Sequence, residues 1–219
     1  MSLDDKRARL AGSTYLVTII CGVYAEVVAR GERATAAHSV FASDAMFRSG
    51  LIADLFMLAA YIVVTVLFHQ MFREVSNRMS AVAAAFSLVG IAVLACNTFF
   101  LALILRLPDA IPPEYAGPDI ALLLLRAHGD GYKISLVFFG IYCLLLSWLI
   151  WRGRFIPRLV GLMVAAAGAC NVINSLVRLG APQLADYLPG YFTLPTLLGE
   201  LALAVWLLLF GIHRLEERR

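Results

Sequence analysis

The chain has 219 residues, of which 61% are hydrophobic and only 15% are Asp, Glu, Lys or Arg, against about 25% in an average soluble domain. This composition excludes disorder, and it disfavours a soluble domain because a chain this short cannot hide so much apolar surface from water. The net charge of +3 comes without a long basic run, so it does not indicate nucleic-acid binding. We therefore predict an all-α, polytopic membrane protein whose partner is the lipid bilayer.

About 20 apolar residues of helix cross a bilayer core, and six segments of the chain reach this length. In chain order they are Leu10–Ala29, Gly50–Gln70, Met79–Leu105, Tyr132–Trp151, Pro157–Val177 and Gly190–Ile212. Residues 1–219 then form one transmembrane domain, a six-helix bundle with short turns on one side and longer loops on the other.

The fourth segment follows Gly129 and Gly131. Because glycine often interrupts a helix, we expect a break there, with a short helix over Asp119–His128 and a bent entry to the segment.

Lys and Arg are distributed unequally between the two sides of the predicted bundle. With the N-terminus inside, the inner segments carry eleven of the 18 basic residues and the outer segments seven. The positive-inside rule then places both termini in the cytoplasm, for a protein of the cell membrane (inner or plasma membrane). Trp and Tyr are enriched at both membrane surfaces. The predicted bundle agrees with this distribution, with Trp148 and Trp151 near one end and Tyr187 and Tyr191 near the other.

Ionisable side chains are costly in hydrocarbon, so those within the segments should face the bundle interior, pair with one another or line water. Most of them fall in the outer half, on helix faces that also carry small residues, which is typical of interfaces between membrane helices. We predict a carboxylate-lined chamber in that half. Its candidate ligand-binding residues are Glu26, Arg48, Asp54, Asn97, His128, Asn174 and Glu200.

Three functions stay open at this point. The chamber could bind or transport a small cationic or amphiphilic ligand, the polar faces could only specify assembly, or His128 could act as a base on a lipid-like substrate. The sequence contains no HExxH, GxSxG, P-loop or GxGxxG motif, so no catalytic residue or cofactor is assigned. A three-histidine zinc site is excluded, because His128 is the one histidine at the depth of the carboxylates, and the four cysteines lack metal-ligand spacing. No metal site is assigned, although His128 with a carboxylate has the chemistry of a metal ligand and whether a metal binds stays open.

Several short strings, in their order and spacing, resemble the bacterial six-helix membrane proteins of the domain of unknown function 4386 family. They are Ala8–Gly12, Tyr24–Glu26, Phe47–Gly50, Ala53–Leu55, His128–Tyr132, Leu136–Gly140, Phe155–Arg158 and Gly199–Leu201. The resemblance implies a membrane location and a fold but no activity, because the family has no established one. Family members often carry Arg, His and Asp where this sequence has Ser87, Tyr142 and Asn174, which implies a thinner charge network here.

Overall fold

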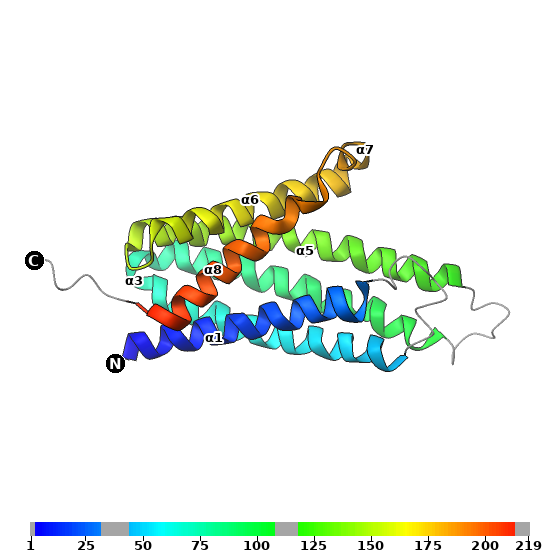
Figure 1. The fold of residues 1–219 in the computed structure, drawn as a ribbon, viewed down its shortest axis with the longest axis horizontal. Coiled ribbons are helices and arrows are strands. Elements are labelled where there is room, and N and C mark those ends of the chain that lie inside the picture. Colours follow the sequence, from blue (N-terminus) through cyan, green and yellow to red (C-terminus); the bar gives the residue numbers. More distant parts are fainter. Residues whose placement is uncertain (1–2, 32–43, 108–117, 213–219) are drawn as a thin grey trace, which may run out of the picture.

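The computed structural model describes residues 3–31, 44–107 and 118–212, and within these ranges it is almost entirely helical and contains no strand. Long helices lie side by side in an elongated bundle (Figure 1). In chain order the helical elements are α1 (Leu3–Val23), the π-helix η1 (Tyr24–Ala29), α3 (Asp44–Ile104), α5 (Pro118–Gly153), α6 (Arg158–Gly180), α7 (Pro182–Ala185), the 3-10 helix η3 (Gly190–Thr193) and α8 (Leu194–Phe210).

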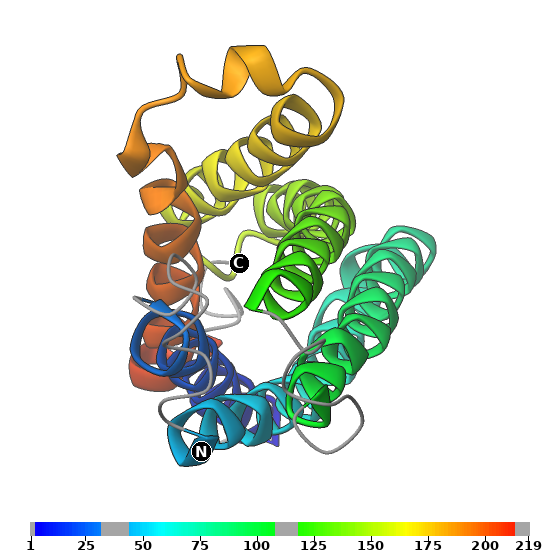
Figure 2. The same ribbon diagram turned by 90° about the vertical axis from the view of Figure 1, so that its right-hand side faces the viewer.

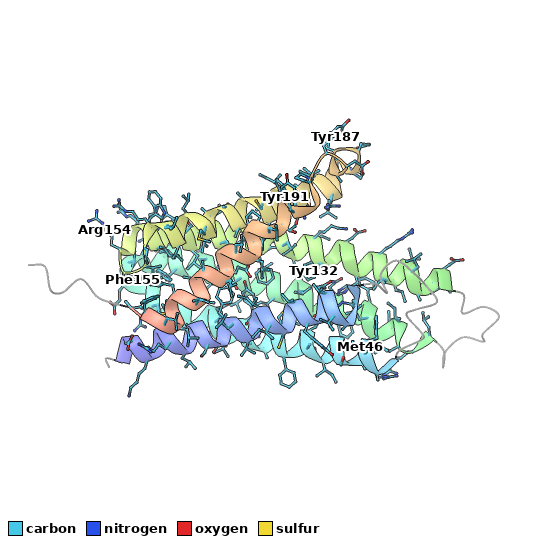
Figure 3. All side chains as sticks on the ribbon, viewed as in Figure 1. Met46, Tyr132, Arg154, Phe155, Tyr187 and Tyr191 are labelled. Atoms are coloured by element: carbon cyan, nitrogen blue, oxygen red, sulfur yellow. The ribbon has the colours of Figure 1, made fainter. Side chains whose placement is uncertain are left out.

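The two ends of the bundle differ in the elements that lie there. We call the end that holds the start of α1 and the end of α8 the proximal end, and the opposite end, where α5 begins, the distal end (Figure 1). Tyr132 lies within the bundle, whereas Tyr187 lies beside α7 at the upper edge of the view (Figure 3).

Helix α3 consists of two antiparallel arms. Ser76, near its middle, has an extended backbone with φ −162° and ψ 106°, so the chain reverses there. The hydroxyl oxygens of Thr65 and Ser87, one on each arm, are 2.7 Å apart. The predicted segments Gly50–Gln70 and Met79–Leu105 are the arms of this helical hairpin.

The surface of the bundle is apolar and its interior is partly polar, the reverse of a water-soluble protein. Phe56, Phe99 and Leu159 are each about two-thirds exposed, while Arg30 and Asp54 are buried. Such an extensive apolar surface indicates contact with lipid. Five described helical stretches, one of them the α3 hairpin, are long and apolar enough to cross a membrane: Asp5–Ala29, Ala45–Ile104, Asp119–Gly153, Arg158–Gly180 and Tyr191–Phe210. These stretches identify a multi-pass membrane protein.

Helix α5 corrects the expectation of a bent entry, because it runs unbroken from Pro118 to Gly153. Gly131 lies inside it, and a Cβ at that position would overlap the side chain of Asn97 on α3. The glycine therefore allows a close approach of a polar side chain. An isolated glycine costs a helix only about 1 kcal/mol, which the packing on both sides of α5 offsets.

Helix α8 crosses the bundle obliquely. Near the proximal end it touches α1 so closely that a Cβ on Gly12 would lie 2.5 Å from the Leu208 nitrogen. Toward the distal end it contacts α6, where the Thr196 hydroxyl donates to Asn171 Oδ1 at 2.8 Å. Consequently α1 and α8 diverge toward the distal end (Figures 1 and 2).

Aromatic rings fill the interior of the proximal half. Tyr15 packs edge-on against Phe68 with 5.7 Å between ring centroids, and Phe68 packs against Phe72 at 6.3 Å. Tyr61 and Phe139 extend this cluster from α3 to α5 at 4.8 Å. Such close edge-to-face packing closes the interior on this side.

Candidate functional site

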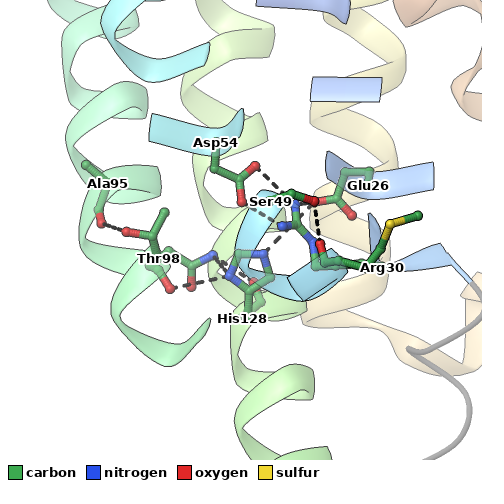
Figure 4. Close-up of polar contacts among 9 residues, drawn as sticks. Glu26, Arg30, Ser49, Asp54, Ala95, Thr98 and His128 are labelled. Atoms are coloured by element: carbon green, nitrogen blue, oxygen red, sulfur yellow. Dashed lines mark hydrogen bonds and ion pairs between the residues drawn. The ribbon is translucent and has the colours of Figure 1, made fainter. Parts of the chain in front are cut away.

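A buried ion-pair network joins the end of η1 to the first arm of α3. Arg30 Nη1 donates to Asp54 Oδ2 at 2.6 Å and Nη2 donates to Asp54 Oδ1 at 3.1 Å, a two-pronged contact. Nη2 also donates to Glu26 Oε1 at 2.8 Å (Figure 4). The side chains of Arg30 and Asp54 are only 4% and 6% exposed, while that of Glu26 is 41% exposed.

Arg30 follows the membrane-spanning stretch and stays charged. Burial acts against the charged guanidinium, but the hydrogen bonds and negative charges of Asp54 and Glu26 outweigh burial and raise the pKa of Arg30 above its ordinary value. One cation therefore faces two carboxylates in this network, which leaves an excess of negative charge.

His128 and Asn97 extend the network to α5 and the second arm of α3. Asn97 Nδ2 donates to the His128 carbonyl at 2.9 Å and lies 2.9 Å from the ring nitrogen Nδ1. The other ring nitrogen, Nε2, lies 4.0 Å from Glu26 Oε1. Both His128 and Asn97 are buried, so α1, α3 and α5 meet through polar contacts at one level of the distal half.

The backbone around Glu26 has an unusual conformation. Residues Tyr24–Ala29 form a π-helix, a rare element that is frequent at functional sites because it widens one turn and redirects side chains. Arg30, four residues after Glu26, reaches back to its carboxylate from the end of this turn.

A cavity of about 340 Å³ lies between the diverging parts of α1 and α8. Two carboxylates contribute to its lining, Glu26 near the network and Glu200 on α8. Most other lining side chains are apolar or aromatic, and the aromatic ones are Tyr61, Tyr132 and Phe139. We call this cavity the chamber.

The chamber wall carries polar groups with unused hydrogen-bonding capacity. The Tyr61 hydroxyl and Asn171 Nδ2 are buried and have no hydrogen-bond partner within the described part of the chain. Buried polar atoms are nearly always paired, so these two atoms are exceptions among the residues that line the chamber. Glu200 lies beside the phenol of Tyr15, at the border of the aromatic cluster.

The sequence model of a family described as a domain of unknown function (DUF4386) matches residues 10–211. The chain belongs to this family. The DUF4386 match runs from α1 to the residue after α8 and confirms the resemblance found in the sequence strings. Comparison with curated proteins gave no match, and neither did comparison with solved structures.

Four of the seven candidate residues of this DUF4386 protein come together in the network: Glu26, Asp54, Asn97 and His128. Glu200 lies apart from that network but shares the chamber with Glu26. Among the described residues, no group of three or more His, Cys, Asp or Glu side chains is placed to hold a metal ion.

Arg48 and Asn174 lie outside this arrangement. Arg48 is exposed and does not line the chamber, because six residues of helix rotate it about 120° away from Asp54. Arg30, which was not among the candidates, provides the cation that pairs with Asp54. Asn174 is buried on α6, where its Oδ1 accepts a hydrogen bond from Arg178 Nε at 2.9 Å, and it does not line the chamber either.

Sequence reasoning missed Arg30 and Asn171 as site residues. Arg30 stood just beyond the predicted segment and was therefore assigned to a loop. Its spacing of four from Glu26 was the available signal, because such pairs face each other on a helix. Asn171 precedes Asn174 by three residues on the same face, and only the position of α8 decides which one reaches the chamber.

Proposed function

We propose that this DUF4386 protein crosses a bacterial inner membrane six times, with both termini in the cytoplasm. The reversal of α3 at Ser76 and the excess of basic residues near the proximal end support this topology. Gln183 is exposed in α7 and Asn77 is exposed beside the reversal. A cysteine at Gln183, in a background without the native cysteines, should react with an impermeant maleimide from outside, and one at Asn77 should react only after lysis. The opposite pattern would contradict the topology.

We further propose that the chamber binds a small amphiphilic cation, such as an amine with an apolar tail. The observation that carries this proposal is the joining of two carboxylates and a mostly apolar wall in one cavity of about 340 Å³. That volume lies in the range of small-molecule sites, which combine apolar walls with a few polar groups. An apolar tail fits the wall and an ammonium group fits Glu26 or Glu200.

The charge of the chamber favours a cation over an anion. Glu26 shares Arg30 with Asp54, so one guanidinium offsets two carboxylates. No Lys, Arg or His is among the described residues that line the chamber, so no cation there competes for Glu200. The faces of Tyr61 and Tyr132 provide a further attraction for an ammonium group, because aromatic rings bind cations through their quadrupole.

The shape of the bundle favours binding over passage through the protein. Transport needs an opening at the other end, and the aromatic cluster of the proximal half lies there instead. Entry and release would occur between α1 and α8, the two helices that border the chamber and diverge distally. This arrangement supports a protein that takes its ligand from the membrane or from the distal side and returns it there.

The test uses three probes of equal chain length: octylamine, octanol and octanoate. Each is titrated against the purified protein in nanodiscs, and the shift in melting temperature is measured. We expect octylamine alone to stabilise the wild-type protein, and Glu200→Gln to abolish that shift while the protein stays folded. Asp130→Asn is the matched control, because Asp130 is an exposed carboxylate whose partner is Lys133.

Two results would contradict a ligand chamber. Equal stabilisation by all three probes would indicate non-specific partition into the lipid. A Glu200→Gln protein that melts at a lower temperature but keeps the full octylamine shift would assign Glu200 to the packing of the bundle.

A further inference from the structure

A second pocket lies at the proximal end of the bundle, away from the chamber. Its volume is about 510 Å³. Its lining comes from α1, the end of the first arm of α3, the end of α5 and the residues that follow α5 and α8. Three arginines belong to the lining: Arg7, Arg73 and Arg152. They come from α1, α3 and α5, so the fold gathers three basic side chains that are far apart in the sequence.

The charge of this pocket is positive. Among the described residues of the lining, one carboxylate, Glu74, accompanies the three arginines, which leaves a net charge of two positive units on them. Arginine is suited to phosphate because its planar guanidinium presents several donors to the phosphate oxygens. The Arg152 guanidinium also lies 5.6 Å from the ring centre of Trp148. Because tryptophan is enriched at membrane surfaces, this contact places Arg152 near headgroup level.

The rest of the pocket is suited to more than a bare anion. Met71, Val75, Phe155 and Ile212 provide an apolar part of the lining beside the arginines. Phe155, labelled at the proximal end in Figure 3 beside Arg154, stacks on Phe72 at 5.1 Å and is thereby fixed. A phospholipid headgroup joins a charged phosphate to a glycerol and acyl region, and this pocket offers a matching surface to each part.

We propose that the proximal pocket binds the phosphate group of an anionic phospholipid. Basic pockets between membrane helices on the side with excess positive charge are suited to such headgroups. The proposal is independent of the chamber, because the two cavities share no lining residue and lie in different halves of the bundle.

The test measures lipid binding to the purified full-length protein by native mass spectrometry. Short-chain phosphatidylglycerol, short-chain phosphatidylcholine and glycerol 3-phosphate are titrated separately. We expect phosphatidylglycerol to bind more tightly than phosphatidylcholine, and Arg73→Gln with Arg152→Gln to weaken its binding by about tenfold or more. The matched control is Arg106→Gln with Arg126→Gln, since both of these arginines are exposed and lie toward the distal end.

Glu74→Gln provides a test that does not depend on loss of function. Removal of the one negative charge in the lining should strengthen phosphatidylglycerol binding several-fold, which a misfolded protein would not do. If glycerol 3-phosphate binds the wild-type protein and fails to bind the arginine variant, that result would support a phosphate site, with a soluble phosphate ester as the ligand instead of a lipid. Equal affinity for the two lipids would overturn the proposal, and so would equal losses in the arginine variant and its distal control.

Discussion

The two halves of this bundle hold their helices together by different means. In the distal half, Arg30, Asp54 and His128 join α1, α3 and α5 through charged and polar contacts. In the proximal half, α1 and α3 pack through the aromatic rings of Tyr15 and Phe68. The hydrophobic effect does not drive helices together inside a bilayer, so van der Waals packing and polar contacts between the helices stabilise the bundle. Between the diverging helices of the distal half there is space for the chamber in the interior of the bundle. In the proximal half rings fill the interior, and the second pocket lies at the end of the bundle instead.

The largest effect should follow from breaking the distal ion pair. Arg30→Met leaves Asp54 buried without its cation, so we expect the free energy of unfolding to fall by about 3–5 kcal/mol. Combining Arg30→Met with Asp54→Leu should recover much of that loss, because the buried Asp54 charge is then gone and the remaining carboxylate, Glu26, is 41% exposed. Unfolding by a denaturing detergent measures the free energy of unfolding of the single and the double variant. Arg126→Met is the control, because Arg126 is exposed. A single variant as stable as the wild type would show that the pair does not hold the distal half.

A smaller effect is expected in the proximal half. Phe68→Ala removes a ring that is only 2% exposed and leaves a cavity among Tyr15 and Phe72. We expect a loss of about 2 kcal/mol, below the 3–5 typical of soluble proteins, because the unfolded state in detergent is itself apolar.

The same variant sharpens the contrast between the halves. Octylamine stabilisation should survive Phe68→Ala, since Phe68 does not line the chamber. Phe99→Ala is the control, because Phe99 is 69% exposed on the lipid-facing surface. Loss of the octylamine shift in the Phe68 variant, with the protein still folded, would show that the two halves are not separable.

The smallest effect should come from the neutral hydrogen bond inside the α3 hairpin. Thr65→Val removes the contact between the Thr65 and Ser87 hydroxyls. Hydrogen bonds between membrane helices average about 0.6 kcal/mol, so the free energy of unfolding should fall by no more than about 1 kcal/mol. Thr14→Val is the control, because the Thr14 hydroxyl bonds only the Leu10 carbonyl of its own helix. A loss as large as that of Arg30→Met would remove the distinction between charged and neutral contacts.

Hydropathy and helical phase predicted a large part of this arrangement. Glu26, Asp54 and His128 were grouped because each carries a costly charge or polar ring at the same depth, and the fold does bring them together. The helical segments followed from apolar length alone, because the bilayer sets that length. These features depend on single helices and on depth, which a sequence specifies locally.

The features that sequence reasoning missed depend on how helices approach one another. Gly131 was interpreted as a break, although it makes room for Asn97 from a different helix. Asn174 was a candidate and Asn171 was not, although both lie on one face of α6, and the oblique path of α8 brings Asn171 to the chamber. The π-helix that carries Glu26 left no sequence signal that we recognised, since it differs from an α-helix by one residue in a turn.

The central claim is that the space between α1 and α8 is a ligand chamber. A photoreactive octylamine that carries a diazirine on its tail tests it most directly, with crosslinked residues located by mass spectrometry. We predict labels on Val23, Val27 and Leu197, which line the chamber, and their loss in Glu200→Gln or with excess octylamine. Labels spread over the lipid-facing surface, as at Phe99 and Leu159, and unchanged by Glu200→Gln, would contradict the claim.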